Sequence, residues 1–227
     1  MRLMRFPVLV TAVLFLAAAC SGSPDPVSPS HARPSSLPAP DAETQSEPAR
    51  IALRDLTSAE FQHMWWNWAA STEASQNPVM DTDGRFCSRG QRDEGIWFLA
   101  GTFGSAATRT CTVPEGASVA FPLVNRVSGE SSDCLSFMNE AKGSAVLDSR
   151  TLPHEELAST RIRLTPVEGS PISEPPGIFT WSCGLWVRLD PLTPGTHELS
   201  IRGSSGTFSV SVDYKLLVSK PKPTEAV

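Results

Sequence analysis

The most regular hydrophobic pattern lies toward the carboxyl end of the chain, where apolar side chains alternate with polar ones over positions 208–216. Such alternation predicts a β-strand with one buried face. Apolar runs rich in branched and aromatic residues predict five further strands, at 96–103, 118–125, 160–165, 181–189 and 197–202. Pro122 interrupts the second of these runs and predicts a bulge or an edge position there.

Segments rich in proline and glycine separate these strands, for example at 166–177 and 191–196. Short strands joined by such turns are typical of two stacked sheets. We therefore expect a mainly β fold, namely an antiparallel β-sandwich of the immunoglobulin-like or jelly-roll-like kind. A short helix is also expected at 133–141.

One amino-terminal amphipathic helix is predicted by both its ends and its spacing. Thr57 and Glu60 have the positions of a capping box, and the turn signal Asn77-Pro78 marks the end of the segment. Helical spacing places most of its large apolar side chains on one face: Phe61, Met64, Trp65 and Trp68. We expect this face to pack against the sandwich.

The amino end resembles an export signal. Arg2 and Arg5 precede an apolar stretch at 6–16, and three alanines follow at 17–19. A basic start, an apolar core and small residues at the cleavage point are typical of secretory signals. The alanines and Cys20 resemble the lipobox of bacterial lipoproteins, although Ala stands at position 17, where Leu is usual. An ordinary signal peptide cleaved after position 19 is the alternative.

The segment after Cys20 supports the lipoprotein hypothesis. Residues 21–50 contain seven prolines, many serines and no apolar run. Such a composition cannot bury enough apolar surface to fold, and it forms an extended spacer instead. We expect a signal peptide at 1–19, a lipid-attached tether at 20–50, a single domain at 51–220 and a flexible tail at 221–227. The predicted location is the extracytoplasmic cell envelope, with the lipid on Cys20 as the link to the membrane.

Charge narrows the range of partners. The chain has 19 basic and 24 acidic residues, a net charge of −5, and no basic stripe. Binding to nucleic acid depends on clustered positive charge. Nucleic acid is therefore not an expected partner.

The remaining four cysteines predict disulfides. Cys87, Cys111, Cys134 and Cys183 form an even set in an exported domain, which is typical of oxidising compartments. Four cysteines allow three pairings. We favour Cys87–Cys111 with Cys134–Cys183, because this pairing closes the shortest loops. A zinc site is disfavoured because no two of these cysteines have the close spacing of paired metal ligands.

Other runs carry a resemblance to known sequences. IWFLAGTFG at 96–104, RTCTVP at 109–114, FPLVN at 121–125 and LDPLTPGTH at 189–197 resemble segments of a group of secreted bacterial proteins of unknown function. The resemblance covers about residues 60–218. It implies an exported globular domain and no known activity. The PGTH turn is also similar to the last hairpin of many immunoglobulin-like extracellular modules.

The common catalytic motifs are incomplete. His154-Glu155 begins like the zinc-protease motif HExxH, but position 158 is Ala. The run GSSGT at 203–207 is not GxSxG, because its last residue is Thr. An irregular calcium loop through Asn77, Asp81 and Asp83 is a weak candidate, and a polar turn before Cys87 is the simpler interpretation. No catalytic residue and no cofactor is predicted.

Two functional hypotheses remain. Trp66 falls off the apolar helix face, beside His63 and Asn67, and these three residues form a possible binding surface for an envelope glycan or protein. The simpler interpretation is that Trp66 packs beneath a loop. The first hypothesis is therefore a binding or structural module of the cell envelope. The alternative is an envelope hydrolase acting on glycans, with acids such as Asp81, Asp83 or Glu94 near Trp97.

Overall fold

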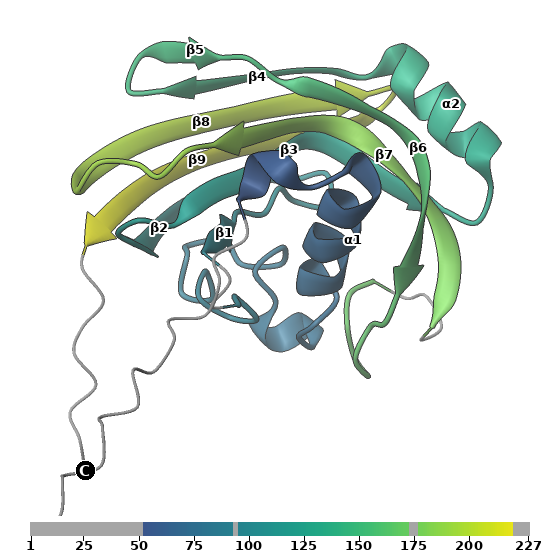
Figure 1. The fold of residues 1–227 in the computed structure, drawn as a ribbon, viewed down its shortest axis with the longest axis horizontal. Coiled ribbons are helices and arrows are strands. Elements are labelled where there is room, and N and C mark those ends of the chain that lie inside the picture. The colour runs from purple at the N-terminus through teal and green to yellow at the C-terminus, as the bar shows by residue number, and fades with distance from the viewer. Residues whose placement is uncertain (1–51, 93–94, 173–176, 220–227) are drawn as a thin grey trace, which may run out of the picture. The chain divides into compact units, whose positions relative to one another are not determined.

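The computed structural model describes residues 52–92, 95–172 and 177–219. The predicted signal, Cys20, the tether, Glu94 and the tail lie outside these residues. The described chain folds mainly as β-structure, in two packed sheets with a helix near the amino end (Figure 1). The predicted fold class and amino-terminal helix are confirmed at this level.

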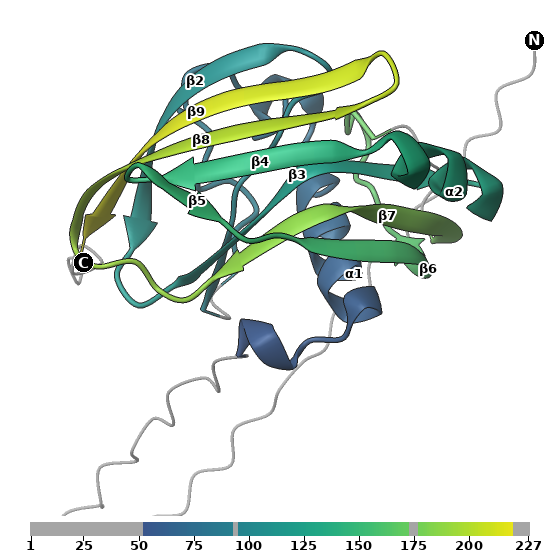
Figure 2. The same cartoon turned by 90° about the horizontal axis from the view of Figure 1, so that it is seen from above.

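One sheet has four strands and the other has five (Figure 2). The four-stranded sheet has the order β1 (Ile96–Phe98), β3 (Ser118–Ser128), β7 (Ile178–Leu189) and β6 (Glu155–Leu164). The five-stranded sheet has the order β2 (Ala106–Pro114), β9 (Phe208–Ser219), β8 (Gly195–Ser205), β4 (Lys142–Leu147) and β5 (Arg150–Leu152). The helices are α1 (Ser58–Ala69) and α2 (Ser131–Glu140), with short 3₁₀ turns at Leu53–Asp55 and Ala74–Gln76. Among the described residues, no helix has the length and apolar character needed to cross a membrane.

The expectation of wholly antiparallel sheets is wrong at one pair in each sheet. β1 pairs with β3 in parallel, and β2 pairs with β9 in parallel. The chain leaves β1, crosses to the other sheet as β2 and returns as β3, so β1 and β3 run in the same direction. β2 and β9 are far apart in sequence, and no hairpin constrains their relative direction.

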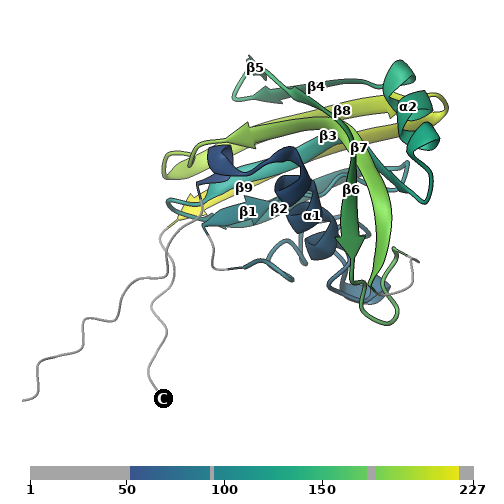
Figure 3. The same ribbon diagram turned by 45° about the vertical axis from the view of Figure 1, so that its right-hand side comes forward.

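The four-stranded sheet is buried on both faces, and this explains the position of α1. On β3, Val119 and Phe121 face the other sheet, whereas Ala120 faces the helix side. Trp186 of β7 also lies on the helix side, with its ring 5.1 Å from that of Phe61. The helix therefore covers the outer face of this sheet (Figure 3).

The start of α1 has the predicted capping box. The Thr57 hydroxyl accepts a hydrogen bond from the Glu60 amide, and the Glu60 carboxylate accepts one from the Thr57 amide. These bonds satisfy amide groups that the first turn of a helix leaves unpaired. The capping box therefore fixes where the helix begins.

The two sheets come close together around Leu123. A Cβ atom at position 203 would lie 2.0 Å from the Leu123 carbonyl oxygen, and one at position 143 would lie 2.7 Å from the Leu123 Cβ. Only glycine fits at these two positions. The register of β3 against β7 also shifts between Pro122 and Val124, which confirms the predicted bulge.

Both disulfides have the predicted pairing. Cys87 is bonded to Cys111, and Cys134 to Cys183. The second bridge joins α2 to β7. Disulfides persist in oxidising compartments, so the pair suggests an extracytoplasmic location.

Candidate functional site

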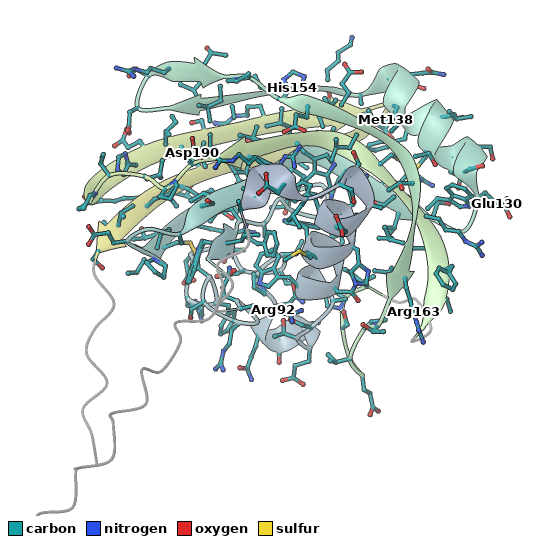
Figure 4. The ribbon with its side chains drawn as sticks, viewed as in Figure 1. Arg92, Glu130, Met138, His154, Arg163 and Asp190 are labelled. Atoms are coloured by element: carbon teal, nitrogen blue, oxygen red, sulfur yellow. A yellow bond between two sulfur atoms is a disulfide. The ribbon has the colours of Figure 1, made fainter. Side chains whose placement is uncertain are left out.

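A groove of ≈ 580 Å³ lies beside α2, between the helix and the turn that joins β8 to β9. In Figure 4, Glu130 and Met138 mark the two ends of this helix. The groove wall includes residues from α1, β3, the loop after β1 and the loop after β6. Segments distant in sequence therefore build one hollow of the size usual for small-molecule sites.

Aromatic side chains form much of the wall. Phe103 is 51 % exposed, an unusual fraction for a large apolar side chain. Phe208 is partly buried, and Phe137 and Trp66 are mostly buried. Exposed aromatic surface within a concave site is typical of ligand contact.

Two buried N–H donors in the groove wall have no acceptor. They are Nε1 of Trp66 and Nδ2 of Asn125, and each is without a hydrogen-bond partner in the described part of the chain. Four other side-chain atoms share this condition, but they line none of the hollows described here: Gln62 Nε2, Trp97 Nε1, Ser159 Oγ and Trp186 Nε1. Leaving a buried donor unpaired costs about 1–3 kcal/mol. Trp66 Nε1 and Asn125 Nδ2 have almost no accessible surface, so both atoms lie behind the surface of the groove.

Arg109 fixes the loop that carries Phe103. Its side chain is 1 % exposed and donates to the carbonyl oxygens of Val79, Asp81, Ala100 and Gly101 at 2.7–3.2 Å. It also donates to the Tyr214 hydroxyl at 2.7 Å, and that hydroxyl donates to the Ala100 carbonyl. Burial raises the pKa of the Tyr214 hydroxyl, so it stays protonated and remains a donor.

The α2 side of the groove is held by contacts at both ends. Ser205 at the end of β8 donates to the carbonyl of Phe137 at 2.7 Å. The disulfide between Cys134 and Cys183 ties the first turns of the helix to β7. These bonds fix the helix relative to the sheets, so the groove is formed before any ligand arrives.

The groove wall includes two acidic residues, Asp133 and Glu140, and one basic residue, Arg126. Asp133 accepts from the Ser128 hydroxyl, and its carboxylate lies 3.3 Å from the Arg126 guanidinium. The Ser128 hydrogen bond and the Arg126 charge lower the pKa of Asp133. Asp133 is thus a carboxylate at neutral pH. Glu140 lies two helical turns further along, with its backbone about 10 Å away along the axis.

The predicted surface of Trp66, His63 and Asn67 is divided in the structure. Trp66 is only 6 % exposed and lines the groove, and this agrees with the interpretation that it packs beneath a loop. Asn67 instead bonds the carbonyl of Arg163 and both the amide and hydroxyl of Thr165. Arg163 is labelled near the end of β6 in Figure 4, so Asn67 ties α1 to that strand.

The weak calcium candidates serve as turn formers. Asn77 donates to the carbonyls of Ala69 and Thr72 and accepts from the Val79 amide. The Asp81 carboxylate accepts amide hydrogen bonds from residues 83, 84 and 86. Asp83 pairs with Arg85, which lowers the pKa of its carboxyl well below the usual range. Among the residues described, no three acidic, histidine or cysteine side chains gather at one point.

His197 lies outside the groove. It forms hydrogen bonds with Asp148 and Thr193, and we call these three residues the histidine clasp. Its Nδ1 lies 2.6 Å from Asp148 and its Nε2 lies 2.8 Å from the Thr193 carbonyl oxygen. The hydrogen bonds to Asp148 and to Thr193 raise the pKa of His197, and the same pair lowers the pKa of Asp148. Asp148 lies in the turn between β4 and β5, with a positive φ of 46°. The clasp therefore holds this turn against the segment before β8.

No pattern in the sequence predicts the groove itself. Phe103 and Asn125 each lie in or beside a predicted strand, where they resemble ordinary sheet residues. Their shared site appears only when the two sheets and α1 are assembled. No protein-family model, no curated protein and no solved structure matches the chain.

Proposed function

We propose that the chain is an exported lipoprotein of the cell envelope whose domain binds an envelope ligand in the aromatic groove. The observation that carries the binding proposal is the groove of ≈ 580 Å³ itself, whose wall presents the half-exposed ring of Phe103. A hollow of this size with exposed aromatic surface is typical of a ligand site.

The proposed cellular location rests on other observations. The two disulfides favour an oxidising compartment. The apolar amino end with its alanines and Cys20, followed by the proline-rich segment, has the pattern of a lipid-anchored chain with a spacer. In this proposal lipid on Cys20 holds the protein to a membrane, and the spacer lets the groove reach ligands away from the surface. The resemblance to secreted bacterial proteins is part of the same proposal.

Binding is better supported than hydrolysis. A glycan hydrolase needs one protonated carboxyl and one carboxylate, about 5–10 Å apart. Asp81 and Asp83 are engaged in a turn and a salt bridge. In the groove, the hydrogen bond from Ser128 and the charge of Arg126 hold Asp133 as a carboxylate, so it does not supply the protonated acid. These contacts favour ligand recognition over proton transfer.

The proposal is tested by sedimentation with two envelope fractions, insoluble cell wall and membrane vesicles. The protein is the exported chain with Cys20→Ser, which removes the lipid attachment. Phe103→Ala removes exposed groove surface, and Phe179→Ala is the matched control because Phe179 is 58 % exposed but lies outside the groove. We expect the chain to sediment with one fraction, and Phe103→Ala alone to weaken this about tenfold. Equal binding by both variants, or no binding to either fraction, would contradict the proposal.

A further inference from the structure

Strand β3 has an open edge along much of its length. β7 pairs with β3 from Val119 to Ser128, whereas β1 pairs with the opposite edge only from Ser118 to Ala120. The last contact on that side is the hydrogen bond from the Leu99 amide to the Ala120 carbonyl. Beyond this point, no strand in the described part of the chain lies against the β1 side of β3.

The direction of the backbone groups shows which residues face the open side. The Ser128 carbonyl faces β7, because it accepts from the Thr180 hydroxyl at 2.6 Å. The Val124 carbonyl also faces β7, because a Cβ atom added to the glycine of that strand would lie 2.6 Å from its oxygen. Backbone groups point alternately to the two sides along a strand. Asn125 and Val127 therefore turn their N–H and C=O groups to the open edge.

The groove runs along this edge. Asn125, Arg126 and Val127 all line it, although successive side chains of a strand point to opposite faces of the sheet. A hollow that touches three consecutive residues lies along the edge of the strand and not over one face. Arg126 is exposed and its two neighbours are only half-buried, so the edge is accessible from the groove.

The chain itself covers the outer edges of two other long strands. On β2, the Thr110 amide donates to the Asp83 carbonyl. On β6, the Arg163 carbonyl accepts from the Asn67 side chain. Proteins commonly cover strand edges in this way, because an open edge pairs with other chains. The open edge of β3 differs from both, and it lies beside a groove with room for a ligand.

The groove wall also has one charge without a partner. Asp133 and Arg126 pair at 3.3 Å, whereas Glu140 has no ion pair among the described residues. A negative charge in the wall favours a basic side chain on the ligand. The rings of Phe103 and Phe208 offer apolar contact in the same hollow.

We infer that the groove binds an extended peptide, which adds to the sheet as a further strand beside Asn125 and Val127. The two residues supply two donors and two acceptors, enough for about four backbone hydrogen bonds. Apolar side chains of the peptide contact Phe103 and Phe208, and a lysine or arginine lies near Glu140. This inference rests on the proposed function and specifies the ligand as a segment of polypeptide.

Hydrogen exchange in the unliganded Cys20→Ser chain tests whether the edge is open. We expect the amides of Asn125 and Val127 to exchange at least about tenfold faster than the amide of Arg126, which points to β7. Amides at 125 and 127 that exchange as slowly as the amide at 126 would overturn the inference.

Calorimetric titration with blocked nonapeptides tests the binding mode. The probe peptide alternates valine and threonine and has lysine at both ends. Two matched peptides carry N-methyl groups on the odd or on the even internal residues, which removes the N–H groups of one edge only. We expect one methylated peptide to bind at least about tenfold more weakly and the other almost unchanged. Equal weakening by both, or no binding of the unmethylated peptide at about 1 mM, would overturn the inference. Glutamate in place of the two lysines should weaken binding about threefold.

Val127→Pro removes one N–H from the open edge and leaves the ladder to β7 intact, and proline is tolerated at strand edges. Val127→Ala is the matched control, because it shortens the same side chain but keeps the N–H. We expect the proline variant to bind the lysine peptide at least about tenfold more weakly than the alanine variant. Equal binding by the two would contradict strand addition. Circular dichroism checks folding, and the methylated peptides decide the matter if the proline variant does not fold.

Protease digestion of the envelope fraction separates the two proposals. We expect it to abolish sedimentation of the chain with that fraction. Sedimentation that survives digestion and still depends on Phe103 would overturn the peptide inference and leave the proposed function standing, with a glycan as the ligand. A dimer in sedimentation velocity that Val127→Pro abolishes would assign the edge to a second copy of the chain instead.

Discussion

Replacing Arg109 by Met is expected to loosen the loops that form the inner end of the groove. The guanidinium supplies donors to four backbone carbonyls and to the Tyr214 hydroxyl. The Ala100 carbonyl would keep its bond from Tyr214, whereas those of Val79, Asp81 and Gly101 would lose their Arg109 donor.

The size of the effect follows from these three carbonyls. Each buried acceptor left unpaired costs about 1–3 kcal/mol. Removal of a buried charge returns part of that cost, because the charge no longer has to be desolvated. We expect the free energy of unfolding to fall by about 3 kcal/mol. Tyr214→Phe is the control and should cost less, about 1–2 kcal/mol, because the Ala100 amide loses its acceptor but Arg109 still donates to the Ala100 carbonyl.

Urea unfolding followed by tryptophan fluorescence measures both variants. Ligand binding provides a second readout, because Val79 and Gly101 line a small hollow that shares Trp66 and Phe103 with the groove wall. We expect affinity for the bound envelope fraction to fall in Arg109→Met under conditions where the variant is still folded. A stability loss below 1 kcal/mol, or one no larger than that of Tyr214→Phe, would refute this view of Arg109.

Three further predictions concern the disulfide at the groove, the histidine clasp and the anchor. Replacing Cys134 and Cys183 together by Ala should lower the free energy of unfolding by about 4 kcal/mol, because the bridge closes a loop of 49 residues. Ligand binding should weaken as well, because the bridge fixes α2. An unchanged urea midpoint would count against this prediction. His197→Gln should destabilise the fold most near pH 5–6 and least at pH 9. The clasp is complete below the ordinary imidazole pKa of about 6.5; its contribution is lost as pH rises through the raised pKa of His197, and also as pH falls through the lowered pKa of Asp148. A loss of stability in urea unfolding that does not depend on pH would exclude this role. Mass spectrometry of the membrane fraction should find an amino-terminal Cys20 carrying acyl chains, and Cys20→Ala should move the chain to the soluble fraction; an unmodified Cys20 would overturn the lipoprotein proposal.

Local sequence patterns predicted the helices and strands whose buried positions hold apolar side chains and whose exposed positions hold polar ones. The alternation at 208–216 predicted most of β9, and the capping box at Thr57 predicted the start of α1. β2 was not predicted, because one of its inward positions holds Arg109 and the others include small Ala107. A charged residue at a core position breaks the hydrophobic period that sequence reasoning relies on.

Two features depend on tertiary structure: the direction of the edge strands β1 and β2, and the formation of the groove. The pairing of β2 with β9 joins segments about a hundred residues apart, and no local motif encodes its direction. Helical phase placed Trp66 off the apolar face of α1 and left open whether it binds a ligand or packs beneath a loop; in the structure it shares walls with Phe103 and with Ile172, from the loop after β6. Helical phase locates the side of a helix, whereas the loops around the helix decide what that side contacts.

Sedimentation of the Cys20→Ser chain with insoluble cell wall and with membrane vesicles tests the groove as a ligand site most directly. We predict that the chain sediments with one of the two fractions, and that Phe103→Ala weakens this binding whereas Phe179→Ala does not. Equal binding by the two variants, or binding to neither fraction, would contradict the account.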